Sequence, residues 1–393
     1  MSNKKYAYVN NEILAWARST TPFVSTRDVQ DRINIDSTKI DLWEKGEEYP
    51  SITEAKKLAK LYKLPFATFF LTIPPTSDPR PYTDRRTKSD SIYGPLSYEL
   101  WAEIERVIGN RERLLDFIDD EELELYEMIP MVDNSASVEA IGKTIRSFLG
   151  LSLPFKNKMA YGNNSYKYFR NLIESKGILV SQISGVSINE MKGISLYYDC
   201  FPIIAVNNKD YDRAKSFSLF HELAHLVRRS SSLCLIDFDE RNDTEEKLCD
   251  AIATEVLMPR KIFITVVEDA VKMHHQYSEE YLNYIADRFG VSIFSVIRRL
   301  YETGIIKKDE YISMYEEFSR QFEEKQKEID LNIESKDRRI PYYIRYLNRE
   351  GYLYTRMIMT SYSKGFISYG ELCNTLGVKS AHINKMERAV MSI

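Results

Sequence analysis

The sequence contains few cysteines, and no two of them form a CxxC pair. This scarcity excludes a disulfide scaffold and fits a reducing compartment. No window approaches the roughly 18 consecutive apolar residues that a membrane span needs, and the N-terminus lacks the apolar segment of a signal peptide. No internal repeat is evident either. We therefore expect a cytoplasmic protein without a membrane partner. The four cysteines are Cys200, Cys234, Cys249 and Cys373.

The chain also lacks a strong excess of either charge. Its 54 Lys and Arg face 58 Asp and Glu, which gives a formal net charge of −4. This balance excludes a protein that coats nucleic acid by bulk charge, although it is compatible with a local basic face. Hydrophobic residues at 44% and charged residues at 28% exclude a disordered, collagenous or coiled-coil chain.

A length of 393 residues predicts two or three separate hydrophobic cores. Residues 9–71 show helical periodicity, and Ser51 with Glu54 forms a capping box that starts the last helix there. The stretch 74–90 is rich in proline and charge, which is typical of a linker. We expect an N-terminal domain at 1–73, a linker at 74–90, a helical connector at 91–149, a central domain at 150–306 and a helical C-terminal module at 307–393.

The central part combines helices with short extended runs. The segments ILVSQI, GISLYY and PIIAVN are β-branched or aromatic and are separated by Gly, Asp and Pro, which predicts a small antiparallel sheet. Helical patterns surround them, and one amphipathic helix carries Tyr311, Phe318 and Phe322 into a charged run. That run is most simply a solvated helix end, with a partner-binding arm as the alternative. The expected fold class is α+β and mostly helical.

The strongest signal for chemistry is an HExxH motif at residues 221–225. At about 100° per residue, four residues return His225 to within roughly 40° of His221, so both imidazoles leave one helical face and can hold one metal ion. Apolar residues flank the motif and no Pro or Gly interrupts it. The alternative is a pair of histidines without a metal. We favour zinc as the cofactor.

A catalytic zinc needs a third protein ligand and a position for water. Glu246 and Asp250 lie four residues apart on the helix expected for EEKLCDAIATEVLM. Glu246 is our choice of ligand, with Glu245 as the alternative. Asp250 is expected to hydrogen-bond the distal nitrogen of a ligand histidine and to fix its tautomer.

With zinc bound, Glu222 is expected to act as the general base for a water that attacks a peptide carbonyl, and then to protonate the leaving amine. The strand GISLYY is expected to pair with the substrate backbone as an edge strand. The group that stabilises the oxyanion stays open among five candidates, each of which has a structural role as its alternative. They are Tyr197, Tyr198, Tyr211, His274 and His275.

Residues 165–306 resemble the ImmA/IrrE family of zinc metallopeptidases. The stretch PIIAVNNKDYDRAKSFSLFHELAHLV is similar to that family's strand, Asn-containing turn and HExxH helix, and EEKLCDAIATEVLMPRKIF is similar to its Glu-bearing helix with a Leu-Met-Pro end. Cys249 stands where Ala is usual. The resemblance implies a zincin-like cytosolic protease of narrow specificity that cleaves or inactivates a DNA-binding repressor and so switches on a stress, prophage or mobile-element response.

Residues 9–71 separately resemble XRE-type helix-turn-helix domains, through LWEKGEEYPSITEAKKLAKLYKLP. The resemblance implies that Ser37, Thr38, Lys39 and Lys45 face DNA. Residues 37–48 nevertheless hold two lysines against four acidic residues, so this segment fits DNA or a protein partner. The tail ISYGELCNTLGVKSAHINKME also has helix-turn-helix spacing, for which we favour a helical cap.

The sequence thus predicts a zinc-dependent endopeptidase that acts on a protein transcription regulator, most simply a helix-turn-helix repressor. The alternative is a DNA-binding regulator, or an antitoxin-like module, that uses the peptidase fold as a sensor.

Overall fold

The computed structural model describes residues 5–75, 96–118, 123, 126, 128–133, 135–155, 165–229, 232–235, 244–333 and 340–391. It divides into two compact units, Met1–Ile108 and Gly109–Ile393, which are described separately. The division falls within helix α5 (Tyr98–Leu115). Most of the predicted linker, residues 76–90, lies outside the described residues, so the domain boundaries stay predictions.

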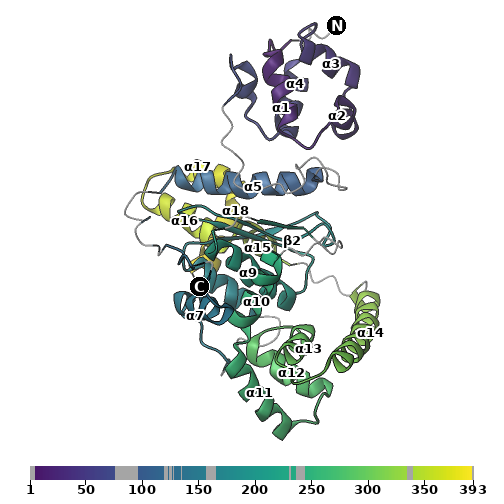
Figure 1. Ribbon diagram of the computed structural model, residues 1–393. Helices are drawn as coiled ribbons and strands as arrows, with labels where there is room; N and C mark the ends of the chain where they lie inside the picture. Colours follow the sequence, from purple (N-terminus) through teal and green to yellow (C-terminus); the bar gives the residue numbers. More distant parts are fainter. Residues whose placement is uncertain are drawn as a thin grey trace. The chain divides into compact units, whose positions relative to one another are not determined.

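The first unit is helical (Figure 1). Side-chain caps set where its helices begin. The predicted capping box forms at the start of the fourth helix, since Ser51 Oγ accepts a hydrogen bond from the Glu54 amide at 3.2 Å and the Glu54 carboxylate accepts one from the Ser51 amide at 2.8 Å. Ile13, Leu14 and Trp43 lie in its core. Its elements are α1 (Asn11–Ser19), α2 (Thr26–Ile33), α3 (Ser37–Lys45), α4 (Ile52–Leu61), a 3₁₀ helix η1 (Phe66–Phe70) and the first part of α5.

Helices α2 and α3 are the two consecutive helices on which the predicted helix-turn-helix rests, and they pack against each other. Three residues join them, and Asn34 takes a left-handed conformation with φ of 52°. Of the four acidic residues in 37–48, two are turned toward the unit itself: Asp41 accepts from the Thr26 hydroxyl at 2.9 Å, and Glu44 forms an ion pair with Arg18 at 2.8 Å. Membership of the XRE family stays a prediction.

The second unit contains a four-stranded sheet in the order β1-β3-β2-β4. The prediction of an antiparallel sheet is wrong for one pair, because β1 (Leu179–Ile183) runs parallel to β3 (Ile203–Asn207). Strand β2 (Met191–Leu196) pairs antiparallel with β3 and with β4 (Ser232–Leu235). The prediction that GISLYY forms a free edge is therefore also wrong, since β4 covers that side of β2.

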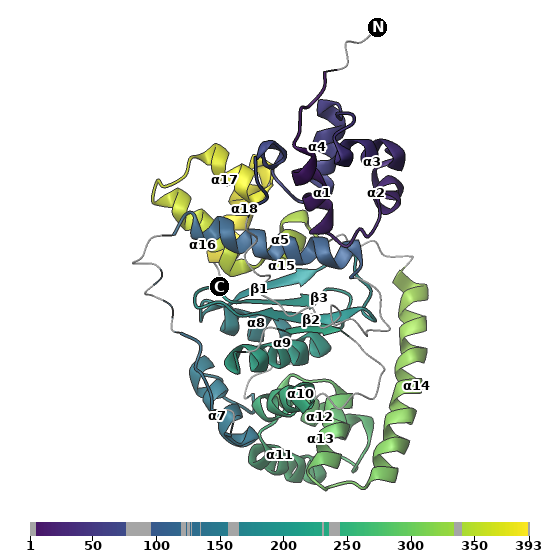
Figure 2. The same ribbon diagram turned by 45° about the horizontal axis from the view of Figure 1, so that its top comes forward.

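Helices surround this mixed sheet, and the mostly helical α+β fold is confirmed. Figures 1 and 2 show α8 and α9 on one side of the sheet and α10 to α13 beyond them. The largest core lies between the sheet and these helices, and Tyr311, Met314 and Phe318 of α14 pack against it. The helices of this layer are α7 (Val138–Leu149), α8 (Ser165–Glu174), α9 (Asp212–Val227), α10 (Thr244–Leu257), α11 (Arg260–Met273), α12 (Glu279–Phe289), α13 (Ile293–Glu302) and α14 (Lys308–Ile333).

The C-terminal helices are joined to strand β1 through a buried charged pair. Arg170 of α8 donates to the carbonyls of Val180 and Leu347, at 3.0 and 2.9 Å. The Glu174 carboxylate, one turn later, accepts from the amides of Tyr352 and Leu353 and so caps the first turn of α16. The helices of this group are α15 (Tyr342–Glu350), α16 (Tyr352–Ser363), α17 (Tyr369–Leu376) and α18 (Ser380–Met391).

Candidate metal centre

The HExxH motif lies in the middle of the buried helix α9. His221, Glu222 and His225 are at most 8% exposed. The helix is enclosed by the sheet on one side and by α10 on the other, so a polar sequence there is costly unless its groups are paired or bind an ion. Since the motif sits in a core, its polar groups need partners from a neighbouring element.

Helix α10 supplies those partners. Glu246 Oε2 lies 3.1 Å from His221 Nε2, and Glu246 Oε1 lies 3.5 Å from His225 Nε2. The two Nε2 atoms are themselves 3.2 Å apart. Three donor atoms from two helices therefore converge on one point.

These distances fit a single zinc ion. Donors placed about 2.0 to 2.1 Å from a tetrahedral metal lie about 3.3 Å from one another. The separation between the two Nε2 atoms is 3.2 Å, and each Nε2 lies 3.1 or 3.5 Å from one of the two Glu246 carboxylate oxygens, which is close to that value. Two imidazole nitrogens and one carboxylate are also a donor set that zinc prefers.

Asp250 lies one turn after Glu246 on the same face of α10. Its Oδ1 is 2.9 Å from His221 Nδ1. An ionised carboxylate only accepts hydrogen bonds, so Nδ1 carries a proton and Nε2 faces His225 and Glu246, where its lone pair becomes available to a metal when the second proton leaves. Arg298 of α13 lies 3.4 Å from the other Asp250 oxygen and thereby holds this carboxylate from behind.

The pKa values of His221 and Glu246 show that the carboxylates of the cluster stabilise a positive charge among them. Burial lowers the pKa of His221, but hydrogen bonds to Asp250 and Glu246 outweigh it and raise the pKa to about 10. Burial alone would raise the pKa of Glu246, yet its contacts with His221 and His225 hold that pKa far below its usual range. Without a metal, a proton on His221 thus compensates the carboxylates; with a metal, that proton is replaced.

The alternative ligand Glu245 is occupied elsewhere. Both of its carboxylate oxygens accept from the Arg228 guanidinium, at 2.8 and 2.9 Å. Glu245, Cys249 and His225 also come close enough to be grouped as metal donors. Burial raises the pKa of Cys249, however, which opposes the thiolate that a metal requires. The geometry favours Glu246 over Glu245.

Glu222 points toward the sheet, where a glycine leaves room for it. An added Cβ at Gly193 of β2 would lie 3.0 Å from both Cγ and Cδ of Glu222, and the three atoms nearest to that Cβ all belong to Glu222. A side chain at residue 193 would displace the carboxylate. The sequence signal for this contact was a glycine inside a strand, which often marks the close approach of another group.

The cluster opens into a cavity of about 330 Å³. Lys192 and Arg298 give it two cationic side chains, and Ser292 and Ser295 add hydroxyls, so its lining is polar beyond the proposed metal ligands themselves. A second cavity of about 740 Å³ shares Lys192, Asp210, Ala214 and Ser292 with the first. Its other walls include five aromatic residues, Tyr211, Phe294, Tyr315, Phe318 and Phe322.

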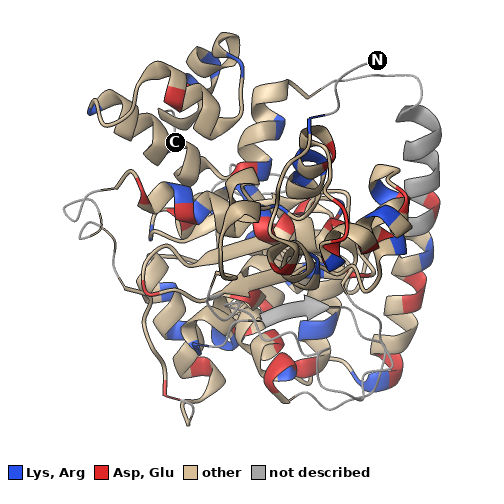
Figure 3. Ribbon diagram, turned by 90° about the horizontal axis from the view of Figure 1, so that it is seen from above, with Lys and Arg blue, Asp and Glu red and all other residues tan. Residues whose placement is uncertain are grey.

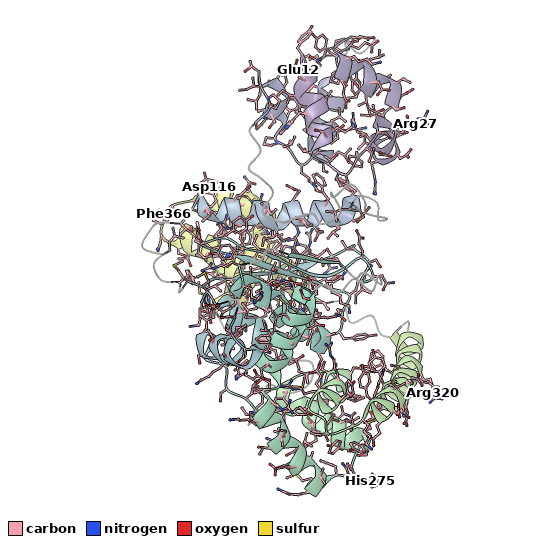
Figure 4. All side chains as sticks on the ribbon, viewed as in Figure 1. Glu12, Arg27, Asp116, His275, Arg320 and Phe366 are labelled. Atoms are coloured by element: carbon pink, nitrogen blue, oxygen red, sulfur yellow. The ribbon has the colours of Figure 1, made fainter. Side chains whose placement is uncertain are left out.

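The five oxyanion candidates do not line the first cavity among the described residues. Tyr197 donates to Asp199 at 2.7 Å, and the Tyr198 ring carries the Arg111 guanidinium 3.6 Å from its centroid. His274 packs on Tyr284. His275 lies at the outer end of the region between α11 and α12, away from α9 (Figure 4). Tyr211 lines only the second cavity. Lys192 and Arg298, which sequence reasoning missed, lie closer to the proposed chemistry.

No described helix combines the length and the apolarity that crossing a membrane requires. No curated protein and no solved structure matches the chain significantly.

One family model does match part of the chain. Residues 173–301, which run from the end of α8 into α13, match the IrrE N-terminal-like domain, Peptidase_M78. The matched range contains both helices that carry the metal donors and the strand that faces Glu222. This match supports a metallopeptidase of the ImmA/IrrE type in residues 173–301.

Proposed function

We propose that the protein is a zinc-dependent endopeptidase that cleaves a protein transcription repressor. The observation that carries the proposal is the convergence of His221, His225 and Glu246 at the spacing that zinc ligands need, with Glu222 lining the same cavity as His221 and Glu246. The order of these residues, HExxH with a Glu from the following helix, is that of a gluzincin-like site.

In this proposal each residue of the cluster has a separate task. His221, His225 and Glu246 would hold the zinc, and Asp250 fixes the tautomer of His221. When bound, zinc lowers the pKa of water toward about 7 and polarises a peptide carbonyl.

Glu222 moves the protons. Its carboxylate accepts a proton from the attacking water and delivers it to the amine that leaves when the peptide bond breaks. Burial to 1% exposure excludes competing bulk water, and Gly193 sets the position of the carboxylate relative to the cavity. Proton transfer therefore depends on one side chain whose place is fixed by the sheet.

The cavity suits a peptide substrate. Lys192 and Arg298 bring positive charge to it, and cationic side chains can stabilise the oxyanion that forms at the attacked carbonyl. The larger aromatic cavity beside it is suited to a bulky apolar side chain of the substrate. The repressor as substrate and a cytoplasmic location rest on the family resemblance and stay part of the proposal.

A second candidate is a regulator that binds DNA and uses the metal site as a sensor. The arrangement of α2 and α3 favours it, with Thr38, Lys39 and Lys45 exposed and Ser37 half-buried at the start of α3. In that case the protein would need zinc but not Glu222.

Glu222→Gln distinguishes the two candidates. The substitution keeps the side-chain volume and all three proposed ligands but removes the proton acceptor. We expect one zinc per chain and an unchanged melting temperature. The rate of repressor cleavage should fall on the order of 10²- to 10⁴-fold. Zinc is measured by mass spectrometry of the metal, and cleavage by co-expression with a repressor encoded beside the gene.

Glu268→Gln on the exposed face of α11 is the matched control, because it makes the same chemical change away from the cavity. It should behave as the parent protein. Normal target-gene induction by folded, zinc-loaded Glu222→Gln protein would reject proteolysis and favour the regulator.

A further inference from the structure

The C-terminal helices α17 and α18 follow each other after a short turn, as in a helix-turn-helix, and each packs against α16. Helix α17 starts at a capping box of Ser368 and Glu371 and ends at Gly377, whose φ of 62° is left-handed. Three residues later α18 begins. Leu376, Val378 and Ile383 are buried at this junction, and packing of both helices on α16 sets their arrangement.

We propose that this element binds duplex DNA through the outer face of α18. The proposal does not depend on the proposed peptidase activity, because it concerns a different surface of the second unit. It also changes the interpretation of this tail from a helical cap to a binding module.

The outer face of α18 carries mainly polar and basic side chains and a single carboxylate, that of Glu387. At about 100° per residue, its exposed residues fall within a sector of about 160°, with Glu387 at one edge. The buried residues Ile383, Met386 and Val390 lie on another side. The exposed residues of the sector are Ser380, Ala381, Asn384, Lys385, Glu387, Arg388 and Met391, and exposed Lys379 adjoins it.

The N-terminal helix-turn-helix offers an internal comparison. Both motifs have a left-handed residue in the turn, Gly377 in one and Asn34 in the other. We compare the six residues that stand 2, 3, 4, 7, 8 and 11 positions after each left-handed residue. After Gly377 they are Lys379, Ser380, Ala381, Asn384, Lys385 and Arg388. After Asn34 they are Asp36, Ser37, Thr38, Asp41, Leu42 and Lys45. The C-terminal set carries three positive charges and no negative charge, whereas the N-terminal set carries two negative charges and one positive.

Charge is also segregated along the chain. Residues 341–393 contain seven Lys and Arg against three Asp and Glu, a net charge of +4, so the remaining 340 residues carry −8. Figure 3 shows Lys and Arg on the outer turns of the helices around the C-terminus. Phosphate neutralisation by such side chains drives affinity for DNA, while the acidic remainder of the chain opposes unspecific attachment elsewhere.

The shape of this element selects B-form DNA. A helix with its side chains is about 10 to 12 Å wide and enters a major groove about 12 Å wide. The major groove of A-form RNA is too narrow for it. Asn384, Lys385 and Arg388 are residue types that read base edges or phosphates from that groove.

The test compares the full-length protein with three variants, using a fluorescent 30-base-pair DNA duplex of random sequence between about 50 and 200 mM salt. In Lys379→Gln/Lys385→Gln/Arg388→Gln, loss of three phosphate contacts should lower the slope of log K against log salt by about 2.7 and weaken binding at low salt by at least about tenfold. The changes lie at exposed residues, and thermal melting checks that the fold is retained.

The matched control is Lys307→Gln/Lys308→Gln/Arg320→Gln, which removes the same charge around α14. Arg320 points outward there (Figure 4). The third variant, Lys39→Gln/Lys45→Gln, tests the N-terminal motif. Loss in the C-terminal variant alone supports the proposal. No binding by the parent protein, an equal loss in the control, an effect confined to the N-terminal variant, or equal binding of an RNA duplex of the same length would overturn it.

Discussion

Gly193→Ala tests whether the sheet positions the general base. The added Cβ would meet Cγ and Cδ of Glu222 at 3.0 Å, whereas carbon atoms in contact normally lie about 3.5 to 4.0 Å apart. Either Glu222 or the strand must therefore move by about 0.5 to 1 Å. Because Glu222 is buried within α9, we expect its carboxylate to leave the position from which it accepts the proton.

The expected loss follows from that displacement. A misplacement of about 1 Å at a reacting group can lower the rate about 10²-fold. Overpacking in a core costs about 1 to 3 kcal/mol, which lowers the melting temperature by several degrees without unfolding the protein. Zinc should be retained, since the three atoms nearest to the new Cβ are all from Glu222 and none from a metal ligand.

The assay measures cleavage rate, zinc per chain and melting temperature for Gly193→Ala, with Gly370→Ala as the control. A Cβ at Gly370 meets only Ser368 Oγ, at 3.9 Å, so this control should be fully active. Adding Glu222→Asp, which shortens the acid by one methylene, provides a double-mutant cycle. If the clash causes the defect, Glu222→Asp should cost less activity in the Gly193→Ala protein than in the parent. Parental activity in Gly193→Ala, or strictly additive losses, would refute the reasoning.

Four further predictions concern the ligands, the charge of the site, the linker and the C-terminal helices. We expect metal analysis to find well below one zinc per chain in His221→Ala, His225→Ala and Glu246→Ala. Glu245→Ala should retain its zinc, because Glu245 is paired with Arg228. The opposite result for the two glutamates would reverse the ligand assignment. In the metal-free protein the pKa of His221 in the folded state is raised to about 10. Protonated His221 therefore adds its full contribution to the free energy of unfolding below about pH 6.5, and this contribution is lost as the pH rises through 10. Denaturant unfolding after chelation should show a decline of up to about 5 kcal/mol over this range, and His221→Gln should abolish the decline; equal slopes in both proteins would contradict the prediction. Limited trypsin digestion should cut first within 74–90, which the composition marks as a linker, and early cuts only inside 177–300 would show that the boundaries are misplaced. Glu174→Ala should lower the melting temperature by several degrees, because it leaves Arg170 buried without its carboxylate and uncaps α16, and an unchanged melting curve would argue against this role.

The parts of the site that the sequence predicts are those set by local spacing. The HExxH residues share a face because they lie four apart on one helix, and Glu246 with Asp250 repeats that spacing on the next. Their convergence needs only that two consecutive helices pack against each other. A short run of apolar residues predicts a strand but does not determine which strand it pairs with. We therefore could not predict that β1 pairs in parallel with β3 or that β4 pairs with β2.

The sequence also could not predict the residues that line the cavity from distant parts of the chain. Arg298 reaches Asp250 from α13, 48 residues further along the chain, and Lys192 comes from β2. The five predicted oxyanion candidates do not line this cavity among the described residues. Four of the five contact neighbouring side chains instead.

The attachment of α16 to Glu174 has a consequence for incomplete chains. Gly351 turns the chain there with φ of 105°, and its backbone passes so close to the Val180 carbonyl that an added Cβ would lie 3.0 Å from that oxygen. A nascent or truncated polypeptide that stops before residue 341 would contain both helices that carry the proposed metal ligands, yet it would lack α15 and α16, which cover β1 and the Arg170–Glu174 pair. Such a fragment would expose a sheet face that the longer chain buries, so we expect it to be degraded as misfolded, and the proposed metal site would persist only in chains that include the module proposed to contact DNA.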